Sequence, residues 1–188
     1  MNSVAIALVH HPILDRQGAV ITTAITNLDL HDMARSACSY GISALYVVHP
    51  VAAQRELALR VKAHWVSGSG ARRIPTREAA MTLVQVVPAI DDVYAALGGR
   101  SNVDLYVTSA RGEGRRVTTY AEARRRMSAC ARTSLVMFGT GWGLTPAVID
   151  ASDVFLAPLD GAGTGYNHLS VRAACAIVLD RLLGTRDG

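Results

Sequence analysis

The stretch Ser134-Leu-Val-Met-Phe-Gly-Thr-Gly-Trp-Gly-Leu-Thr-Pro146 decides the fold class. Its first five residues form a short apolar run that is typical of a buried strand. Gly139, Gly141 and Gly143 then mark a loop, and Thr145-Pro146 supplies a helix cap followed by a proline at the first helical position. A strand, a glycine loop and a helix in this order indicate an α/β fold with a parallel sheet.

The same alternation continues on both sides of this stretch. Further strands are predicted at residues 4–9, 42–48, 103–108 and 154–156. Helices are predicted at residues 28–40, 51–65, 76–86, 91–97 and 120–131, and from Ser170 to the end of the apolar stripe at Leu182. Most strands are apolar on both faces, so we expect an α/β fold with a mostly parallel sheet and helices on both faces. Residues 1–188 are predicted to form one domain.

The composition excludes several classes of protein. The 188 residues are 50% hydrophobic and 18% charged, which is unlike a disordered chain. No apolar run approaches the roughly 18 residues of a membrane span. Met1-Asn2-Ser3 lacks the basic start of a secretory signal. We therefore expect a soluble, cytoplasmic protein with no membrane partner.

The basic residues are clustered. The net charge is +4, and residues 111–132 hold seven arginines against Glu113 and Glu122. A second basic cluster spans residues 55–78. Clustered arginine favours an anionic polymer as partner, whereas solvated helix faces are the alternative interpretation.

The cysteines and histidines do not suggest a metal site. Cys38, Cys130 and Cys175 are far apart in the chain and lack CxxC spacing. Each lies in an apolar, alanine-rich stretch, so we expect three buried thiols. The histidines show no metal-binding spacing, and no metal is predicted.

Three loops follow predicted strands and could carry chemistry, because ligands of parallel sheets bind at the carboxyl ends of strands. They span residues 108–114, 138–146 and 156–170. The glycines at residues 139–143 follow a GxGxG pattern and not GxGxxG, which disfavours dinucleotide binding. The glycine loop either admits a ligand close to the backbone or only connects a strand to a helix, and the glycines alone leave both open.

Three strings in these regions carry a resemblance to a known family. They are Thr26-Asn-Leu-Asp-Leu-His-Asp-Met-Ala-Arg35, Phe138-Gly-Thr-Gly-Trp-Gly-Leu144 and Tyr166-Asn-His-Leu-Ser-Val-Arg172. Together they resemble the motifs of the SPOUT superfamily of S-adenosylmethionine-dependent RNA methyltransferases. The nearest likeness is to a small stand-alone bacterial family of predicted RNA methyltransferases, and it covers almost the whole chain.

The resemblance implies a fold, a cofactor and partners. It implies a C-terminal deep trefoil knot, a homodimer, S-adenosyl-L-methionine as cofactor, and transfer of a methyl group to an RNA nucleotide in tRNA or rRNA. The chain lacks the glutamate of the ribose methyltransferases after its first loop glycine, and Asn167 lies three residues before Ser170. It also lacks the substrate-binding appendix of the tRNA guanosine-N1 branch, so the methylated atom stays open.

The resemblance also assigns residues. The predicted cofactor-binding residues are Thr108, Ser109, Ala110, Phe138, Gly139, Thr140, Gly141, Trp142, Gly143, Leu144, Leu156, Leu159, Asn167, His168, Leu169 and Ser170. The predicted catalytic residues are Arg35, Asn27 and Ser170. The predicted RNA contacts are Arg111, Arg115, Arg116, Arg124, Arg125 and Arg126.

Each assignment has a simpler alternative. Arg35 could do no more than form an ion pair with Asp32. Asn27 and Ser170 could serve as helix caps and nothing else. Trp142 could stack on a ligand, anchor its loop or fill the core. Asp29 and Asp32 are candidate general bases if a base is methylated. The alternative to an enzyme is a cofactor-binding module or pseudoenzyme that binds RNA, or senses the cofactor, without methyl transfer. A Rossmann oxidoreductase has the least support.

Overall fold

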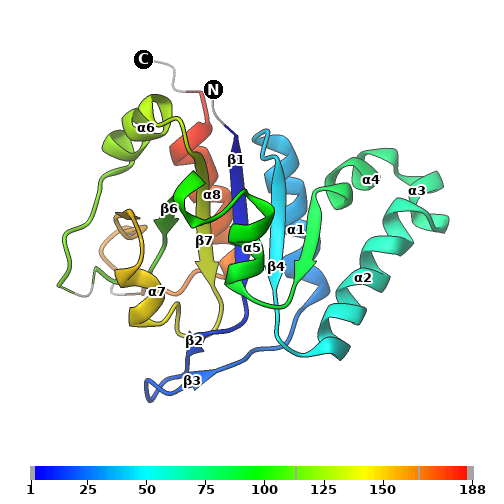
Figure 1. Ribbon diagram of the computed structural model, residues 1–188, viewed down its shortest axis with the longest axis horizontal. Helices are drawn as coiled ribbons and strands as arrows, with labels where there is room; N and C mark the ends of the chain where they lie inside the picture. The colour runs from blue at the N-terminus through cyan, green and yellow to red at the C-terminus, as the bar shows by residue number, and fades with distance from the viewer. Residues whose placement is uncertain (1–2, 113, 165, 186–188) are drawn as a thin grey trace.

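A computed structural model describes residues 3–112, 114–164 and 166–185 of the chain. Its centre is a six-stranded sheet in the order β5-β4-β1-β7-β6-β8, with every neighbouring pair parallel (Figure 1). The strands are β1 (Val4–Val9), β4 (Ala44–Val48), β5 (Val84–Val87), β6 (Val103–Val107), β7 (Thr133–Gly139) and β8 (Val154–Phe155). The predicted α/β class and parallel sheet are confirmed.

The central strand β1 shows why the apolar runs form this sheet. All six of its residues are buried. Ile6 and Leu8 point into one hydrophobic cluster, and Ala7 and Val9 point into the other. A strand that is covered on both faces needs apolar residues at every position, as the sequence provides.

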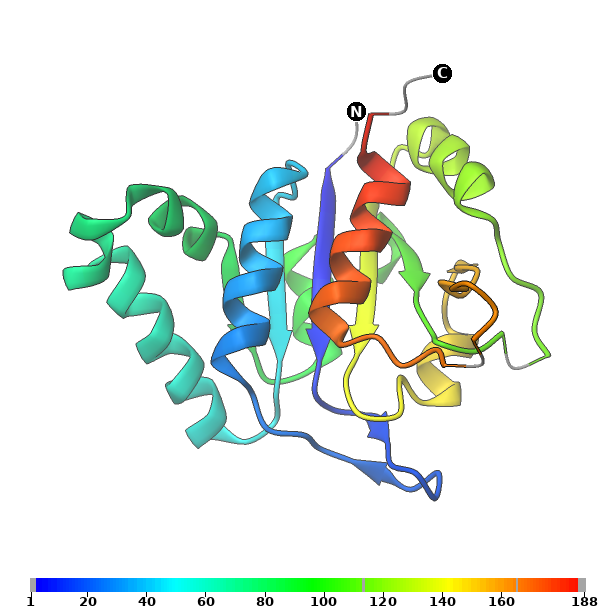
Figure 2. The same cartoon turned by 180° about the vertical axis from the view of Figure 1, so that it is seen from behind.

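Helices cover the two faces of the sheet unequally. On one face, α1 (Asn27–Ser39) and α8 (Val171–Leu183) run side by side, with α6 (Tyr120–Ala129) next to α8 (Figure 2). On the other face lie the shorter α5 (Ile90–Ala96) and α7 (Pro146–Asp150) (Figure 1). The helices α2 (Ala52–Val66), α3 (Ser69–Arg73) and α4 (Pro75–Thr82) extend beyond the β5 edge of the sheet. In the part of the chain that the structure describes, no helix is long and apolar enough to span a membrane.

The order of the strands creates a switch point between β1 and β7. From β1 the chain builds the sheet outward through β4 and β5, and it returns to build the other half from β6, β7 and β8. A short hairpin of β2 (Ile13–Leu14) and β3 (Val20–Ile21) follows β1 at the same edge, and Ile13 pairs with Leu144 after β7. Parallel sheets bind ligands in the crevice at such a switch point.

Local predictions failed in two places. The predicted helix 76–86 ends at Thr82, and Val84–Val87 instead forms the edge strand β5, paired with β4 from Leu45 to Val48. Pairing with a neighbouring strand outweighs the local helical pattern of this valine-rich segment. The predicted start of this helix is also one residue late, because α4 begins at Pro75 and Ile74 precedes it.

The prediction of three buried thiols is wrong for two of them. Cys38 is exposed, Cys130 is partly exposed, and Cys175 is buried. Burial raises the pKa of the Cys175 thiol to about 12, so this sulfur stays protonated at neutral pH. Cys38 lies on the outer side of α1, where an alanine-rich pattern alone does not show which face is covered.

Candidate active site

A cavity of about 620 Å³ opens at the carboxyl ends of the central strands. Its walls come from four separate segments: the chain after β1, the loops after β6 and β7, and the segment that leads from β8 into α8. The volume falls in the range of about 300–1,000 Å³ that small-molecule and cofactor sites occupy. The switch point of the sheet therefore carries a site of cofactor size.

Most predicted cofactor residues line this cavity. These are Thr108, Ser109, Ala110, Phe138, Gly139, Thr140, Gly141, Trp142, Gly143, Leu159, Asn167, His168, Leu169 and Ser170. The loop after β6 and the segment before α8 are joined, because Asn167 Nδ2 donates to the carbonyl of Ala110 at 2.8 Å. Three segments that are distant in the sequence thus meet at one hollow.

Leu144 and Leu156 are the exceptions. Both are buried and lie outside the cavity lining that the structure describes. Leu144 pairs with Ile13 of the hairpin, and Leu156 pairs with Thr118 ahead of α6. The prediction that Leu144 and Leu156 contact the cofactor is therefore corrected. Both pack behind the residues that line the cavity.

The glycines after β7 are required by the protein's own backbone. A Cβ on Gly139 would come within 2.7 Å of the backbone nitrogen of Leu144. Gly141 has a φ of +58°, and a Cβ there would lie 2.9 Å from Ile13 Cδ1. Gly143, with a φ of +103°, faces open space. The tight turn, and not only the approach of a ligand, explains the alternate glycines.

A chain of partly buried hydrogen bonds, which starts at the buried His10, supports the same loop. Thr140 Oγ1 donates to the carbonyl of Val9 at 3.2 Å and lies 2.5 Å from Thr23 Oγ1, which lies 3.0 Å from His10 Nδ1. His10 is fully buried, and its Nε2 has no hydrogen-bond partner among the described residues. Burial first, and then the neighbouring His49, lower the pKa of His10 to about 4. His10 is therefore neutral at physiological pH.

A carboxylate and a guanidinium meet in the cavity wall. Asp29, in the first turn of α1, is 8% exposed and lines the cavity together with Arg172 of α8. Thr26 Oγ1 donates to Asp29 Oδ2 at 2.7 Å, and Arg172 Nη1 donates to Asp29 Oδ1 at 3.3 Å. Arg172 Nε also lies 3.3 Å from Asp32 Oδ2. Of the two acidic candidates, only Asp29 reaches the cavity, whereas Asp32 pairs with Arg172 outside the lining.

The predicted catalytic residues are separated. Ser170 lines the cavity and also caps α8, where its hydroxyl accepts from the nitrogen of Ala173 at 3.3 Å. Asn27 is exposed and is the first residue of α1, and the cap is Thr26, so the predicted capping role of Asn27 is wrong.

Arg35 also lies outside the cavity lining that the structure describes. Its side chain is exposed and borders a separate hollow of about 300 Å³, with Cys38 and Arg77 among the lining residues. Arg35 follows Asp29 by six residues, a spacing that places the two on different sides of a helix. Among the described residues of one chain, the arginines that line the cavity are Arg111 and Arg172, and of these Arg172 is the one that contacts Asp29.

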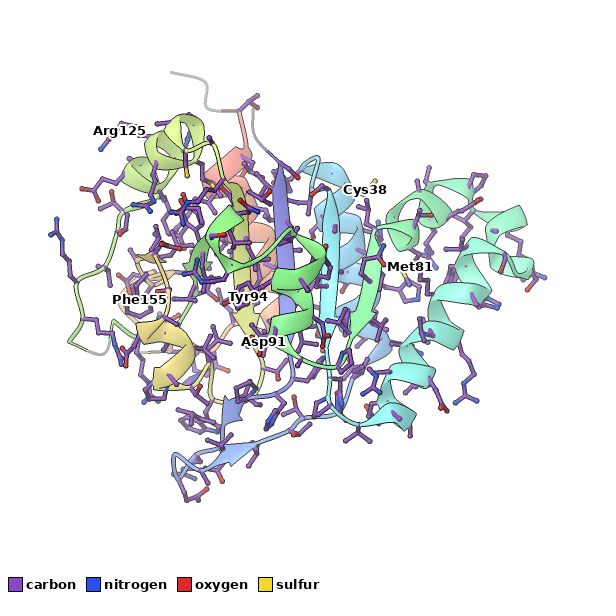
Figure 3. All side chains as sticks on the ribbon, viewed as in Figure 1. Cys38, Met81, Asp91, Tyr94, Arg125 and Phe155 are labelled. Carbon is purple, nitrogen blue, oxygen red and sulfur yellow. The ribbon has the colours of Figure 1, made fainter. Side chains whose placement is uncertain are left out.

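The predicted RNA-contacting arginines divide into three groups. Arg126 donates from Nε and Nη2 to the buried carboxylate of Asp104 at 2.8 and 2.7 Å, so this side chain is committed to the fold and the prediction for Arg126 is revised. Arg115 pairs with Asp150 at 3.0 Å. Arg111 and Arg116 are exposed, Arg124 is half-buried, and Arg125 projects outward from α6 (Figure 3).

The pair with Arg126 also decides the charge of Asp104. Burial disfavours ionisation of Asp104, but the hydrogen bonds from Arg126 and Tyr106 and the charges of Arg126 and Arg132 outweigh burial and lower its pKa. Arg132 forms a second ion pair with the same carboxylate. An arginine-rich helix is therefore partly an internal structural element.

Trp142 is neither a core residue nor a covered anchor. Its side chain is 48% exposed at the cavity. The Arg111 guanidinium lies 5.4 Å from the centroid of the Trp142 ring, and the His168 ring lies 6.2 Å from it. The core-filling interpretation of Trp142 is therefore wrong.

Sequence reasoning missed several residues of the cavity. Thr23 and Ala24 lie in the chain after β1, which leaves the same edge of the sheet as the predicted loops and could have been found by the same rule. Tyr120, Ala157, Val171, Arg172, Ala174 and Val178 were also missed, and Asp29 and Arg111, which were predicted for other roles, complete the lining. Arg172 belongs to the string Tyr166–Arg172 that carries the family resemblance, but the sequence gives no sign that this helical residue faces Asp29.

The lining suits a nucleoside joined to an amino acid. Bare backbone after β7 can bond a flat heterocycle, and the apolar side chains of Phe138, Leu159 and Val178 can cover its faces. Thr108 and Ser109 line the same cavity and supply hydroxyl groups for a polar amino-acid end. S-adenosylmethionine combines these features, so the residues present fit the cofactor that the sequence predicted.

Comparison with known proteins agrees with this fit. Residues 3–184 match a family described as SAM-dependent RNA methyltransferase. A tRNA (guanine-N(1)-)-methyltransferase of Nitratidesulfovibrio vulgaris is 43% identical over 183 residues, which are 95% of this chain. The chain spans only 41% of that relative's length. An uncharacterized protein of Aquifex aeolicus is 40% identical, with 96% of this chain and 88% of that protein covered.

Solved structures give the fold. The SpoU methyltransferase AviRb of Streptomyces viridochromogenes, in complex with AdoMet, superposes with a TM-score of 0.56 at 17% identity, covering 97% of this chain and 57% of that one. The α/β sheet is therefore arranged as in the SPOUT methyltransferases. Because the family match covers nearly the whole chain, the chain belongs to the S-adenosylmethionine-dependent RNA methyltransferases.

Proposed function

We propose that this chain binds S-adenosylmethionine in the cavity between β1 and β7 and directs its methyl group to a nucleotide of RNA. One observation carries the proposal. The glycine loop after β7, the segment before α8 and the loop after β6 converge on a single cavity of about 620 Å³. When bound there, the cofactor supplies an electrophilic methyl group on its sulfonium.

The chain's own residues would bind and orient the cofactor. Backbone groups of Gly139–Gly143 and of residues 167–170 face the cavity and can bond the nucleoside. The hydroxyl chain from His10 through Thr23 to Thr140 holds the loop in place without a charge beneath it. Preorganised polar groups of this kind need not reorganise during the reaction.

We propose Asp29 as the proton acceptor and Arg172 as its partner. Among the described residues, Asp29 is the carboxylate that reaches the cavity, and its hydrogen bonds with Thr26 and Arg172 fix its orientation. A ring nitrogen that carries a hydrogen would lose its proton as it takes the methyl group from the sulfonium, whose S–CH3 bond breaks to leave the demethylated thioether, and a positioned carboxylate can accept that proton. The arrangement therefore supports methylation of a base nitrogen, and Arg172 takes the position predicted for Arg35.

The name of the Nitratidesulfovibrio relative supports the same class of acceptor, a base nitrogen of tRNA. That relative is more than twice the length of this chain, so the particular nucleotide is not transferred from it. Arg111, Arg116, Arg124 and Arg125 are proposed as contacts to the RNA backbone. The segment from β6 to α6, which carries them, runs up one side of the molecule (Figure 1).

We also propose that the chain works as a cytoplasmic homodimer. Leu28 on α1 is 60% exposed and Ile177 on α8 is 36% exposed, and these two helices pack side by side (Figure 2). A second copy would cover apolar side chains on this face. A deep knot of the C-terminal helix, and one domain over residues 1–188, remain part of the proposal on the strength of the SPOUT-like fold.

Two measurements test the function. Calorimetry is expected to show binding of S-adenosylmethionine and its demethylated product, with NAD and ATP much weaker. Transfer of labelled methyl to total RNA should follow, and mapping of modified nucleosides should place it on a base nitrogen. A chain that binds the cofactor but labels no RNA would instead be a binding module, and preference for NAD would contradict the proposal.

A further inference from the structure

Three of the large apolar side chains that the protein leaves exposed gather at the opening of the cavity. Trp142 is 48% exposed, Leu169 is 47% exposed, and both line the cavity. Tyr166 is 72% exposed and contacts the ring of His168, which also lines the cavity. Contiguous exposed apolar surface marks a binding site.

The rings are joined to one another and to an arginine. Trp142 and His168 have centroids 6.2 Å apart at 64°, and Tyr166 and His168 have centroids 5.4 Å apart at 75°. The Arg111 guanidinium lies 5.4 Å from the Trp142 centroid. We name these four side chains, Arg111, Trp142, Tyr166 and His168, the aromatic rim.

The geometry of the aromatic rim leaves ring faces available. Its rings meet edge to face, so they do not stack their faces on one another. The four side chains of the aromatic rim come from three loops, of which two are joined by the bond from Asn167 to Ala110. Tyr166, the most exposed ring, lies outside the cavity lining, so its partner lies beyond the cofactor.

The chemistry of the aromatic rim matches one class of ligand. Unpaired nucleobases stack on aromatic rings and on guanidinium planes, and every base has a face for such contact. In a duplex those faces are already stacked within the helix. The charge of Arg111, which lies over the Trp142 ring, suits the phosphates that accompany an unpaired base.

We propose that the aromatic rim stacks an unpaired base of the RNA beside the cofactor cavity, so that the substrate is a loop or single strand and not a duplex. The inference rests on the proposed function, because it takes RNA as the substrate. It adds the class of RNA and the side chains that select it.

Tryptophan fluorescence provides the test. The chain has two tryptophans, Trp65 and Trp142. A single-stranded hexauridylate is the probe, and an abasic hexamer with the same number of phosphates is its control, each added with the demethylated cofactor present. We expect the hexauridylate to quench emission in the wild-type protein, with no such quenching in Trp142→Phe, in which only Trp65 emits.

Affinities for the same two oligomers complete the experiment. Trp142→Ala and Tyr166→Ala should each weaken hexauridylate binding by about 5- to 150-fold, the measured range for loss of one stacking ring. Trp142→Phe, which keeps a ring, should retain most of the affinity. Leu59→Ala is the matched control, because Leu59 is 48% exposed on α2, outside the cavity lining. Tyr166 is so exposed that its replacement tests the proposal even if a Trp142 variant fails to fold.

Three results would overturn the inference. Equal affinity for the hexauridylate and the abasic hexamer would show that the site binds only phosphates. Equal affinity for a duplex and for the single strand would lead to the same conclusion. Quenching by the demethylated cofactor alone, with none added by the RNA, would assign the aromatic rim to the cofactor. Calorimetry with the cofactor separately tests the proposed function, and its failure would leave an observed quench by RNA intact.

Discussion

Arg172 Nη1 donates to Asp29 Oδ1 at 3.3 Å, and this contact ties the first turn of α8 to the first turn of α1 at the cavity wall. The two residues are 143 positions apart in the chain. Thr26 holds the other oxygen of the carboxylate at 2.7 Å. The contact therefore gives Asp29 a fixed orientation toward the space where a substrate would enter.

Asp29→Asn should remove methyl transfer while leaving the fold and the cofactor affinity in place. The amide has the same shape but cannot accept the proton, and a general base contributes typically about 10²–10⁴ in rate. Single-turnover transfer of labelled methyl, beside calorimetry on the same variant, measures both effects. Asp32→Asn is the control, because Asp32 contacts the same arginine outside the cavity lining. A parallel loss of cofactor affinity would assign Asp29 to cofactor binding.

Arg172→Ala is expected to lower transfer by about 10²–10³, the usual cost of losing one positioned donor, whereas Arg35→Ala should leave transfer near the wild-type rate. The same single-turnover assay compares the two variants. A strong loss in Arg35→Ala would mean that Arg35 acts across a dimer. In that case, mixing Arg35→Ala with Asp29→Asn should restore activity, because some dimers would then hold one complete site.

Gly139→Ala should destabilise the fold by about 1–3 kcal/mol, because its Cβ would overpack a closed turn. The new atom would lie 2.7 Å from the backbone nitrogen of Leu144 and 2.9 Å from the carbonyl carbon of Gly143. Urea unfolding measures the loss. Gly161→Ala is the matched control, since a Cβ there has no neighbour within 4 Å. Equal stability of the two variants would show that the turn opens easily.

His10 should make stability depend on pH. Its native pKa is about 4, below the value of about 6.5 in an unfolded chain, so between these values the unfolded state binds more protons. The free energy of unfolding should therefore fall by about 3 kcal/mol as the pH drops from 6.5 to 4, and no further through His10 below that. His31 and His49, whose pKa values burial also lowers, add in the same direction. His10→Asn should reduce the slope of unfolding free energy against pH, and an unchanged slope would contradict the burial argument.

How much of the molecule the sequence predicts depends on whether the deciding contacts are local. The apolar strand at Val4–Val9 and the helix that begins at Tyr120 were predicted correctly, because each depends on neighbours in the chain. The strand at Val84–Val87 was missed, since it exists by pairing with β4. Gly141, in the cavity lining, also depends on a contact with residues that are distant in the sequence.

The sequence predicted bare backbone for a ligand at Gly141, but a Cβ there meets Ile13 and Leu14 of a hairpin more than a hundred residues earlier. Gly141→Val would therefore strain the fold as well as the site. The sequence does not distinguish Arg35 from Arg172 as the arginine of the site, because nothing local shows which side of a helix faces a cavity. Only the packing of α1 against α8 distinguishes them.

The arginines of α6 allow stability and RNA binding to be separated on a single helix. Arg126 holds the carboxylate of Asp104, which is fully buried. Arg126→Ala should destabilise the fold by about 3 kcal/mol, near the lower end for a broken buried pair, because Arg132 still contacts Asp104. Arg124→Ala and Arg125→Ala together should leave the unfolding midpoint nearly unchanged.

The double variant of Arg124 and Arg125 should instead weaken RNA binding and lower the slope of log affinity against log salt by about 1.4 for single-stranded RNA, since each phosphate contact contributes about 0.7. Urea unfolding and salt-dependent RNA titrations on the same samples measure the two effects. A salt slope equal to that of the wild type would make Arg124 and Arg125 a solvated helix face. Full stability of Arg126→Ala would show that Arg132 alone neutralises Asp104, and would return Arg126 to the candidates for RNA contact.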